Sequence, residues 1–271
     1  MPELPEVEIT CRGIRPLVTG CEVTGVRVRN PHLRRPVPAE LAGAIVGERL
    51  LAVRRRAKYL LLDFARGSVV IHLGMSGTLR VLASDTPPGD HDHVDLLFGE
   101  RLLRYRDPRR FGLLLWLDGD ALGSSLLAGL GPEPLGEGFT GAALHRAMRG
   151  ATVPVKQALM DARRVVGIGN IYASESLFRA RIHPLEAAGR LGLRRCDRLV
   201  AAIRCTLGAA IDAGGSTLRD FVGSDGRPGY FQQQYFAYGR EGLPCRICGK
   251  PIRRVVSGQR ATYFCPGCQQ R

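Results

Sequence analysis

The chain has 271 residues, enough for one or two domains with a sizeable buried core. Its longest uninterrupted apolar stretch, Leu113–Leu117, is too short to cross a bilayer, and its first six residues lack the basic start and apolar core of a secretory signal. Lys and Arg number 39 against 25 Asp and Glu, and the resulting charge of +14 favours a polyanionic partner unless an arginine-rich genome is its only cause.

The first half of the chain changes from a helical pattern to a strand pattern. Residues 4–15 predict a helix, because apolar residues recur every three or four positions and Pro5 suits a first turn. Short apolar runs separated by Gly, Pro or Asp then predict strands at 23–29, 59–64, 69–72, 78–82, 94–98 and 113–117. Several short strands without long helices between them are typical of an antiparallel β-sandwich, which we place at residues 1–130.

Pro2 occupies a chemically distinctive position. A small second residue ordinarily permits removal of the initiator Met, which would leave the Pro2 nitrogen as a free secondary amine. An α-amino group has a pKa near ~8 and is partly neutral and nucleophilic at physiological pH. Its attack on an aldehyde carbon gives a cationic iminium that favours elimination, and Glu3 is placed to move protons. Taken alone, a Met-Pro start is weak evidence for such chemistry.

The second half of the chain predicts helices beyond a linker at residues 131–136, where Pro and Gly deny regular structure. The expected helices are 155–164, 171–179 and a longer one through Leu193–Ile211 that ends at Gly214-Gly215. Residues 222–230 predict a loop. We place a helical domain at 137–238, so the chain as a whole is expected to be α+β.

The eight cysteines form two unlike groups. Cys11, Cys21, Cys196 and Cys205 are scattered among apolar residues and predict buried free thiols in a reducing compartment. Cys245, Cys248, Cys265 and Cys268 form two Cys-x2-Cys pairs separated by sixteen residues. This pattern is typical of one structural Zn²⁺ with no open coordination position, and oxidised disulfides are the alternative.

The predicted zinc site would stabilise a C-terminal zinc finger at residues 239–271. Residues 252–256 and 261–264 predict two strands joined at Ser257-Gly258-Gln259, which places Arg260 near the hairpin tip. Residues 240–271 carry seven basic residues and one acidic residue. Such a rigid cationic finger suits a phosphate backbone, although zinc ribbons also serve purely as folds.

Motifs along nearly the whole chain resemble those of bacterial formamidopyrimidine-DNA glycosylases, the base-excision enzymes for oxidised purines. The matching segments, in the family's order, are residues 1–8 (MPELPEVE), 55–60 (RRAKYL), 72–77 (HLGMSG), 107–112 (DPRRFG), 166–172 (VGIGNIY) and the four clustered cysteines. The related endonuclease VIII branch shares the Pro-Glu start and the zinc finger. It matches less well at Leu4 and around Met75, and it is the alternative family.

The resemblance implies a catalytic set. Pro2 matches the nucleophile that attacks the sugar carbon bearing the damaged base, and Glu3 matches the acid-base partner that helps open the sugar. Lys58 matches a lysine near the lesion that acts as a general acid or in recognition, whereas without the family it would belong to a solvated basic edge. Arg260 matches a phosphate contact that the two-stranded hairpin of the zinc finger, called the zinc hairpin below, brings to these catalytic residues.

The resemblance also implies a set of DNA contacts. A base must leave the duplex before an enzyme can act on it, and Met75, Arg109 and Phe111 match the residues that fill the vacated space. Without the family, Met75 and Phe111 would be core residues. His91, Lys156 and Asn170 match further DNA contacts, the last two in a helix–two-turn–helix motif around residues 167–170. A bare Gly-x-Gly turn would otherwise be a helix C-cap.

One segment departs from the family. Gly150-Ala151-Thr152 carries no charge where many relatives have a lysine-rich stretch, which implies a weaker DNA contact there. Residues 223–231 resemble the family's lid over the flipped purine.

The resemblance thus implies a monomeric, cytoplasmic, nucleoid-associated DNA glycosylase and AP lyase that binds damaged double-stranded DNA in a cleft between its halves. It would excise 8-oxoguanine or ring-opened purines by β,δ-elimination. A zinc-bearing DNA-binding protein that has lost the chemistry is the rival, and retention of Met1 would favour it.

Overall fold

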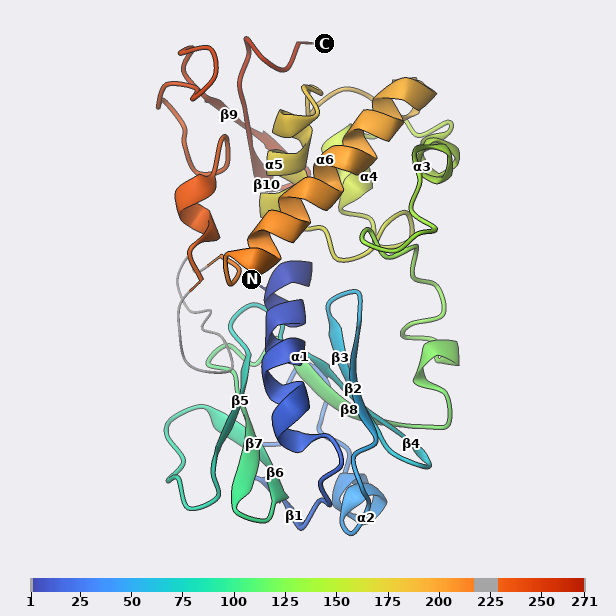
Figure 1. Cartoon of the computed structure of the whole chain (residues 1–271), viewed down its shortest axis with the longest axis vertical. Coiled ribbons are helices and arrows are strands. Elements are labelled where there is room, and N and C mark those ends of the chain that lie inside the picture. The colour runs from blue at the N-terminus through green and yellow to red at the C-terminus, as the bar shows by residue number, and fades with distance from the viewer. Residues whose placement is uncertain (1, 217–228, 271) are drawn as a thin grey trace. The chain divides into compact units, whose positions relative to one another are not determined.

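The structure is a computed structural model that describes residues 2–216 and 229–270, arranged in two compact units (Figure 1). The first unit comprises Met1–Gly129 and Ala213–Tyr230, and the second comprises Leu130–Asp212 and Phe231–Arg271. Each unit is therefore built from two separate stretches of the chain. Among the described helices, none combines the length and apolar character that a membrane crossing requires.

The first unit contains two four-stranded antiparallel sheets, which confirms the predicted sandwich. One sheet has the order β1 (Gly25–Val28), β6 (Asp92–Phe98), β7 (Arg101–Arg106) and β5 (Thr78–Ala83). The other has the order β2 (Ala52–Arg56), β3 (Tyr59–Asp63), β4 (Gly67–His72) and β8 (Leu113–Asp118). The prediction missed β2 and β7 because arginines make up half or more of each strand and hide its apolar positions. A short helix, α2 (Leu41–Ile45), lies between β1 and β2.

Helix α1 (Leu4–Val18) packs against strands of both sheets and closes one side of the core. Its apolar stripe is buried together with residues of both sheets: Val7, Cys11, Ile14 and Val18. The helix extends past the predicted end because Val18 continues this stripe and is fully buried. Each aliphatic side chain buried in this way contributes about 1.5–3 kcal/mol to folding. The core thereby fixes the direction in which the helix presents residues 2 and 3.

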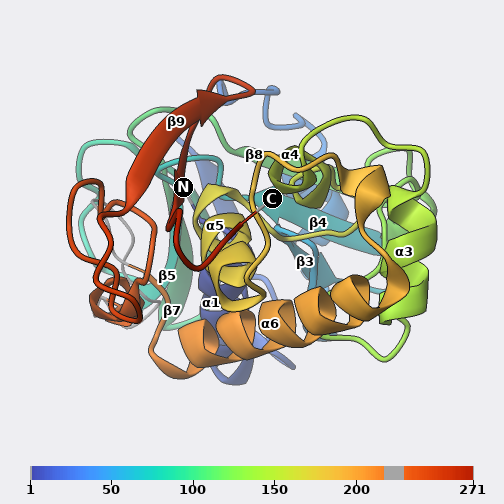
Figure 2. The same cartoon turned by 90° about the horizontal axis from the view of Figure 1, so that it is seen from above.

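The second unit consists of helices and one hairpin. The helices are α3 (Gly141–Met148), α4 (Val155–Leu159), α5 (Asn170–Arg179) and α6 (Leu193–Asp212), and the hairpin strands are β9 (Arg253–Ser257) and β10 (Arg260–Phe264). Short 3-10 turns lie at Ala188–Arg190 and Phe231–Gln234 in this unit and at Ala121–Gly123 in the first unit. Helix α6 packs against both α3 and α5, as Figure 2 shows, and β10 packs against α5.

The helix predicted at residues 155–164 is shorter than expected and ends at Leu159. Asp161 accounts for the early end, because its carboxylate accepts the backbone N–H of Arg163 at 3.1 Å. Such a local side-chain contact offers the backbone an alternative to the helical hydrogen bond. The remaining residues up to Gly169 form the turns that lead into α5.

Glu175 on α5 anchors the chain that enters the cysteine-rich segment. Its buried carboxylate accepts backbone N–H groups of Phe236, Ala237 and Tyr238 at 2.8–2.9 Å. Burial raises the pKa of Glu175, while the three N–H donors oppose that shift. The contact joins α5 to a small core formed by Phe178, Ala237, Cys245, Ile252 and Cys265.

The prediction of four buried free thiols was wrong for two of them. All four cysteines are free, and Cys11 and Cys196 are buried, but Cys21 is half-buried and Cys205 is exposed. Cys205 lies on α6 outside its buried stripe, so the apolar residues around it in the sequence belong to the opposite face of the helix.

Candidate functional site

The amino-terminal residues are fixed by the side chain of Glu6. Pro2 and Glu3 are buried directly before α1. Glu6 Oε2 accepts the backbone N–H of Glu3 at 2.8 Å, and Glu6 Oε1 accepts the N–H of Ser216 at 2.9 Å. One carboxylate therefore holds the residue after Pro2 and the last residue described before the gap at 217–228. Sequence reasoning missed this function of Glu6, although its spacing from Glu3 is the capping-box signal.

Lys58 lies in the turn between β2 and β3, next to Ala57, whose φ is +56°. The half-buried His72 ends β4 opposite Tyr59, and its Nδ1 accepts the N–H of Gly74 at 2.9 Å. Burial, followed by the charges of Arg34 and Lys58, lowers the pKa of His72 to about 4 against an opposing effect of Asp107. The imidazole beside Lys58 is therefore neutral at physiological pH.

Asp107 connects the loops that carry three of the predicted DNA contacts. Its carboxylate is completely buried and accepts the Ser76 hydroxyl at 2.6 Å and the Gly112 N–H at 2.8 Å. The Arg109 N–H lies 3.3 Å from the same carboxylate, and the Tyr105 hydroxyl lies 3.2 Å from it. Residues 75, 109 and 111 each flank one of these donors or are among them, so one buried charge fixes the backbone of both loops.

The side chains held in this way project outward. Met75 is 39% exposed and Phe111 is 45% exposed, so neither is the core residue that its apolar character alone would predict. The Arg109 guanidinium lies over the Phe111 ring at 4.7 Å. Gly74, at φ +61°, allows the two loops to meet, because a Cβ there would lie 2.4 Å from the Gly112 nitrogen.

His91 belongs to the same group of loops. It is exposed at φ +69°, and its carbonyl accepts the N–H of Asp107 at 3.1 Å. Its neighbour His93 is buried with Nε2 2.8 Å from the Asp107 carbonyl. Only His91 presents its ring to solvent, as the predicted DNA contact requires.

The second unit brings together Lys156, Asn170 and the zinc hairpin. Lys156 is 2% exposed, and its ammonium donates to Asn170 Oδ1 at 2.6 Å, the Ala261 carbonyl at 2.8 Å and Thr262 Oγ1 at 2.9 Å. Three acceptors match the three N–H groups of an ammonium. Lys156 thus joins α4, the first residue of α5 and strand β10.

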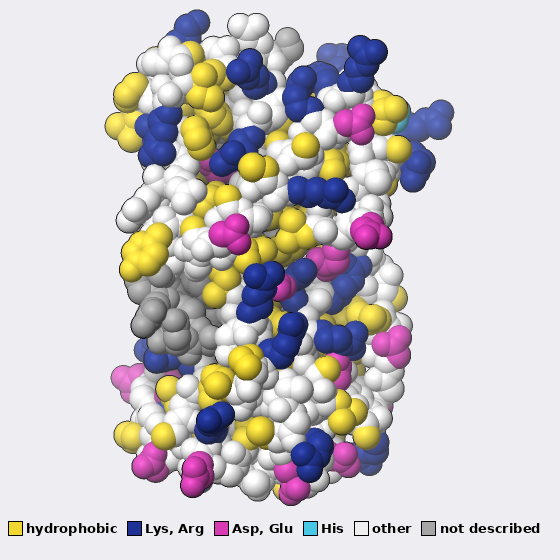
Figure 3. All heavy atoms as spheres, viewed as in Figure 1, with side chains coloured by type: hydrophobic (Ala, Val, Ile, Leu, Met, Phe, Trp, Pro, Cys, Tyr) yellow, Lys and Arg dark blue, Asp and Glu magenta, His cyan; other side chains and the backbone are white. Residues whose placement is uncertain are grey.

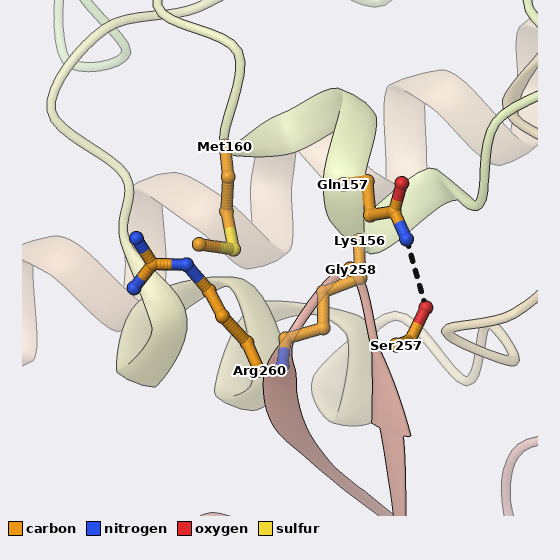
Figure 4. A pocket seen from close by; sticks show the side chains of 6 residues that line it. All are labelled: Lys156, Gln157, Met160, Ser257, Gly258 and Arg260. Atoms are coloured by element: carbon orange, nitrogen blue, oxygen red, sulfur yellow. Dashed lines mark hydrogen bonds between the residues drawn. The ribbon is translucent and has the colours of Figure 1, made fainter.

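Arg260 lines a pocket of about 220 Å³ that Lys156 also lines (Figure 4). It begins β10 opposite Ser257 at the hairpin tip, as predicted. Within the described ranges its side chain makes no hydrogen bond or ion pair and is exposed. Lys and Arg side chains are visible on the displayed face of each unit (Figure 3). Asp and Glu side chains appear on the same face, and the net charge of +14 is what attracts phosphate groups.

The four clustered cysteines fit one structural zinc ion. All four Sγ atoms lie within 4.8 Å of one another, with Cys245 and Cys268 at 3.8 Å and Cys248 and Cys265 at 3.3 Å. Sulfurs around a tetrahedral zinc are about 3.8 Å apart, whereas a disulfide needs about 2.05 Å. The backbone N–H of Lys250 lowers the pKa of Cys248 to about 7, which favours the thiolate. With four protein ligands the zinc has no position open for catalysis.

Two further predicted features lie at the surface or largely outside the described residues. Gly150-Ala151-Thr152 lies partly or fully exposed after α3, so its surface position is compatible with a weak DNA contact. Most of the predicted lid at 223–231 lies outside the described residues. Its end is described, and Tyr230 forms a bridge with Ser216.

Family models match three consecutive parts of the chain. The formamidopyrimidine-DNA glycosylase N-terminal domain matches residues 1–114, and the formamidopyrimidine-DNA glycosylase H2TH domain matches residues 130–222. The zinc finger found in FPG and IleRS matches residues 242–271.

Full-length relatives and solved structures agree with these matches. The chain is 71% identical to the formamidopyrimidine-DNA glycosylase of Aromatoleum aromaticum and 58% identical to that of Paraburkholderia phytofirmans, with both chains covered completely in each comparison. The crystal structure of the Thermus thermophilus MutM (Fpg) protein is 42% identical, with a TM-score of 0.89 and coverage of 99% of this chain and 98% of that one. A Lactococcus lactis FPG mutant in complex with Fapy-dG-containing DNA is 31% identical, with a TM-score of 0.92 and both chains fully covered.

Proposed function

The chain belongs to the formamidopyrimidine-DNA glycosylase family, and from this membership we propose a bifunctional enzyme that excises oxidised purines from duplex DNA and then cuts the strand as an AP lyase. Solved relatives bind DNA containing Fapy-dG or an abasic site, so damaged double-stranded DNA is the partner. The observation that carries the proposal is the outward projection of Met75, Arg109 and Phe111 from loops fixed by buried Asp107.

Base extrusion explains why these three side chains are exposed and yet rigidly held. A thioether and an aromatic ring can enter a base stack, and a guanidinium can hydrogen-bond the base left without its partner. A side chain can enter a base stack only if its own backbone stays in place. The hydrogen bonds to Asp107 hold the backbone of both loops in place. His91, from an adjoining loop, contacts the DNA beside them.

The chemistry belongs to the amino terminus. The unprotonated Pro2 nitrogen attacks C1′ of the damaged nucleotide, the bond from C1′ to the base breaks, and the base leaves with a proton. Glu3 delivers a proton to the ring oxygen of the sugar, which opens the ring and gives a cationic Schiff base. Loss of a C2′ proton then expels the 3′ phosphate, and loss of a C4′ proton expels the 5′ phosphate. Lys58 lies beside the lesion and acts as a general acid or as a recognition group.

The second unit holds the DNA backbone. Asn170 at the start of α5 and Arg260 on the zinc hairpin contact phosphates, and Lys156 supports both by holding Asn170 and β10. The zinc ion contributes structure only. We assign residues 1–130 to the catalytic domain, 131–136 to a linker, 137–238 to the helical domain and 239–271 to the zinc finger. The enzyme works as a monomer in the bacterial cytoplasm, associated with the nucleoid.

Borohydride trapping tests the proposal. Incubation of the protein with a duplex containing 8-oxoguanine and sodium borohydride should give a covalent adduct, because reduction fixes the Schiff base. A Pro2→Gly variant should bind the duplex and give far less adduct and strand cleavage. Absence of an adduct with the unaltered protein would instead support a DNA-binding protein without chemistry. Intact-mass measurement decides whether Met1 has been removed, since a retained Met1 makes the Pro2 nitrogen an unreactive amide.

A further inference from the structure

We propose that Gln157 is a positioning residue for Arg260. Its side-chain amide, on α4, holds the turn of the zinc hairpin so that the Arg260 guanidinium reaches a DNA phosphate. The inference rests on the proposed function, because it explains how the protein sets the geometry of one phosphate contact.

The amide of Gln157 lies directly against the hairpin turn (Figure 4). Its Nε2 donates to Ser257 Oγ at 2.9 Å. Gly258 has φ +56°, and a Cβ there would lie 2.8 Å from the same Nε2 and 3.0 Å from Cδ. The contact is therefore both a hydrogen bond and a close steric fit, and glycine satisfies the backbone and the packing requirement at once.

The two neighbouring residues of α4 hold the hairpin on both sides of Arg260. Gln157 binds at Ser257, the register partner of Arg260, and Lys156 binds at Ala261 and Thr262, which follow it. These contacts join positions about a hundred residues apart in the chain, so they fix the hairpin to the helical part of the unit. Val256 and Gln259, by contrast, are exposed.

The position of the turn decides where the guanidinium can go. The Arg260 side chain is exposed and makes no hydrogen bond or ion pair with any part of the chain that the structure describes. Its reach is consequently set by its backbone rather than by a neighbouring carboxylate. Arginine binds phosphate best through two parallel N–H···O bonds, and this geometry suffers when the backbone shifts.

A double-mutant cycle tests the inference. Gln157→Met keeps a similar side-chain volume and removes the hydrogen bond to Ser257, and Arg260→Ala removes the guanidinium. Gln234→Met makes the same substitution at an exposed glutamine away from the hairpin turn and is the control. The affinity of each variant for a duplex with a tetrahydrofuran abasic-site analogue is measured across a salt series. Zinc content and thermal unfolding are measured alongside to verify folding.

We expect Gln157→Met to weaken binding about three- to tenfold, the range of one lost hydrogen bond, and to leave no further loss in the Arg260→Ala background. The slope of log Kd against log salt should fall toward that of Arg260→Ala, a change of about one phosphate contact. Ser257→Ala removes the other side of the same hydrogen bond, so it should reproduce the loss, and it serves if Gln157→Met does not fold.

The possible failures are distinguishable. An equal loss from Gln157→Met in both backgrounds would overturn the inference, because Gln157 would then act independently of Arg260. Unchanged binding of Gln157→Met and Ser257→Ala beside weakened Arg260→Ala would overturn the inference alone. Unchanged binding of Arg260→Ala would overturn the proposed phosphate contact itself, and the positioning function with it.

Discussion

The hydroxyl of Ser76 donates to the buried carboxylate of Asp107 at 2.6 Å and joins the loop that carries Met75 to the loop that carries Arg109 and Phe111. Both loops cross from one sheet to the other, the first from β4 to β5 and the second from β7 to β8. Residues that are to enter one gap in a base stack must keep a fixed spacing. A single buried charge shared by both loops provides that spacing.

Asp107→Asn should destabilise the protein and separate the two loops. An amide presents one acceptor oxygen and one NH2 group, so at least one of the donors from Ser76 and Gly112 loses its partner in a buried place. Each buried group left without a partner costs about 1–3 kcal/mol. Denaturant unfolding should show a loss in this range, whereas the exposed neighbour Asp90→Asn should be neutral. Equal stability of the two variants would contradict the claim that the hydrogen bonds to Asp107 hold the two loops together.

Phe111→Ala should impair lesion excision without affecting stability. Phe111 is 45% exposed, and surface substitutions usually change the free energy of unfolding by less than about 0.5 kcal/mol. The buried Phe139→Ala is the matched control, with an expected cost of about 3–5 kcal/mol. Single-turnover excision and denaturant unfolding should be measured on both. A large loss of stability in Phe111→Ala would show that the Phe111 ring is packed in the core, contrary to this prediction.

The exposed side chains illustrate what sequence alone can and cannot establish. Met75 and Phe111 were assigned to DNA only through the family resemblance, because apolar residues between strands are ordinarily buried. The zinc ligands and the position of Arg260 followed from local spacing and short-range turn geometry. Asp107 and Glu6 also have local partners, but their connecting role depends on Ser76 and Ser216, which lie 31 and 210 positions away along the chain. Such partners become visible only when the fold brings them together.

Removal of the zinc ion should abolish tight DNA binding while leaving the first unit folded. The four thiolates hold a segment whose small core contains only five buried residues, so the hairpin depends on the metal. Treatment with a strong chelator should lower the affinity for DNA and reduce its salt dependence. The unfolding transition of the first unit, followed by the fluorescence of the buried Trp116, should be unchanged. Cys265→Ser should behave like the chelated protein. Unaltered DNA binding with no zinc present would contradict a structural function for the ion.

His72 should make the protein less stable as the pH falls. The folded state holds this imidazole neutral down to about pH 4, whereas the unfolded chain takes up a proton near pH 6.5. Because the unfolded state then binds more protons, the stabilising contribution is complete above pH 6.5 and is lost progressively toward pH 4, to a total of about 3 kcal/mol. The Gly74 N–H donates to His72 Nδ1, so protonation also removes an acceptor. His72→Asn should flatten the pH dependence of the unfolding free energy in this window, and the exposed His32→Asn should leave it as it is. An unchanged slope in His72→Asn would show that other groups dominate the acid sensitivity.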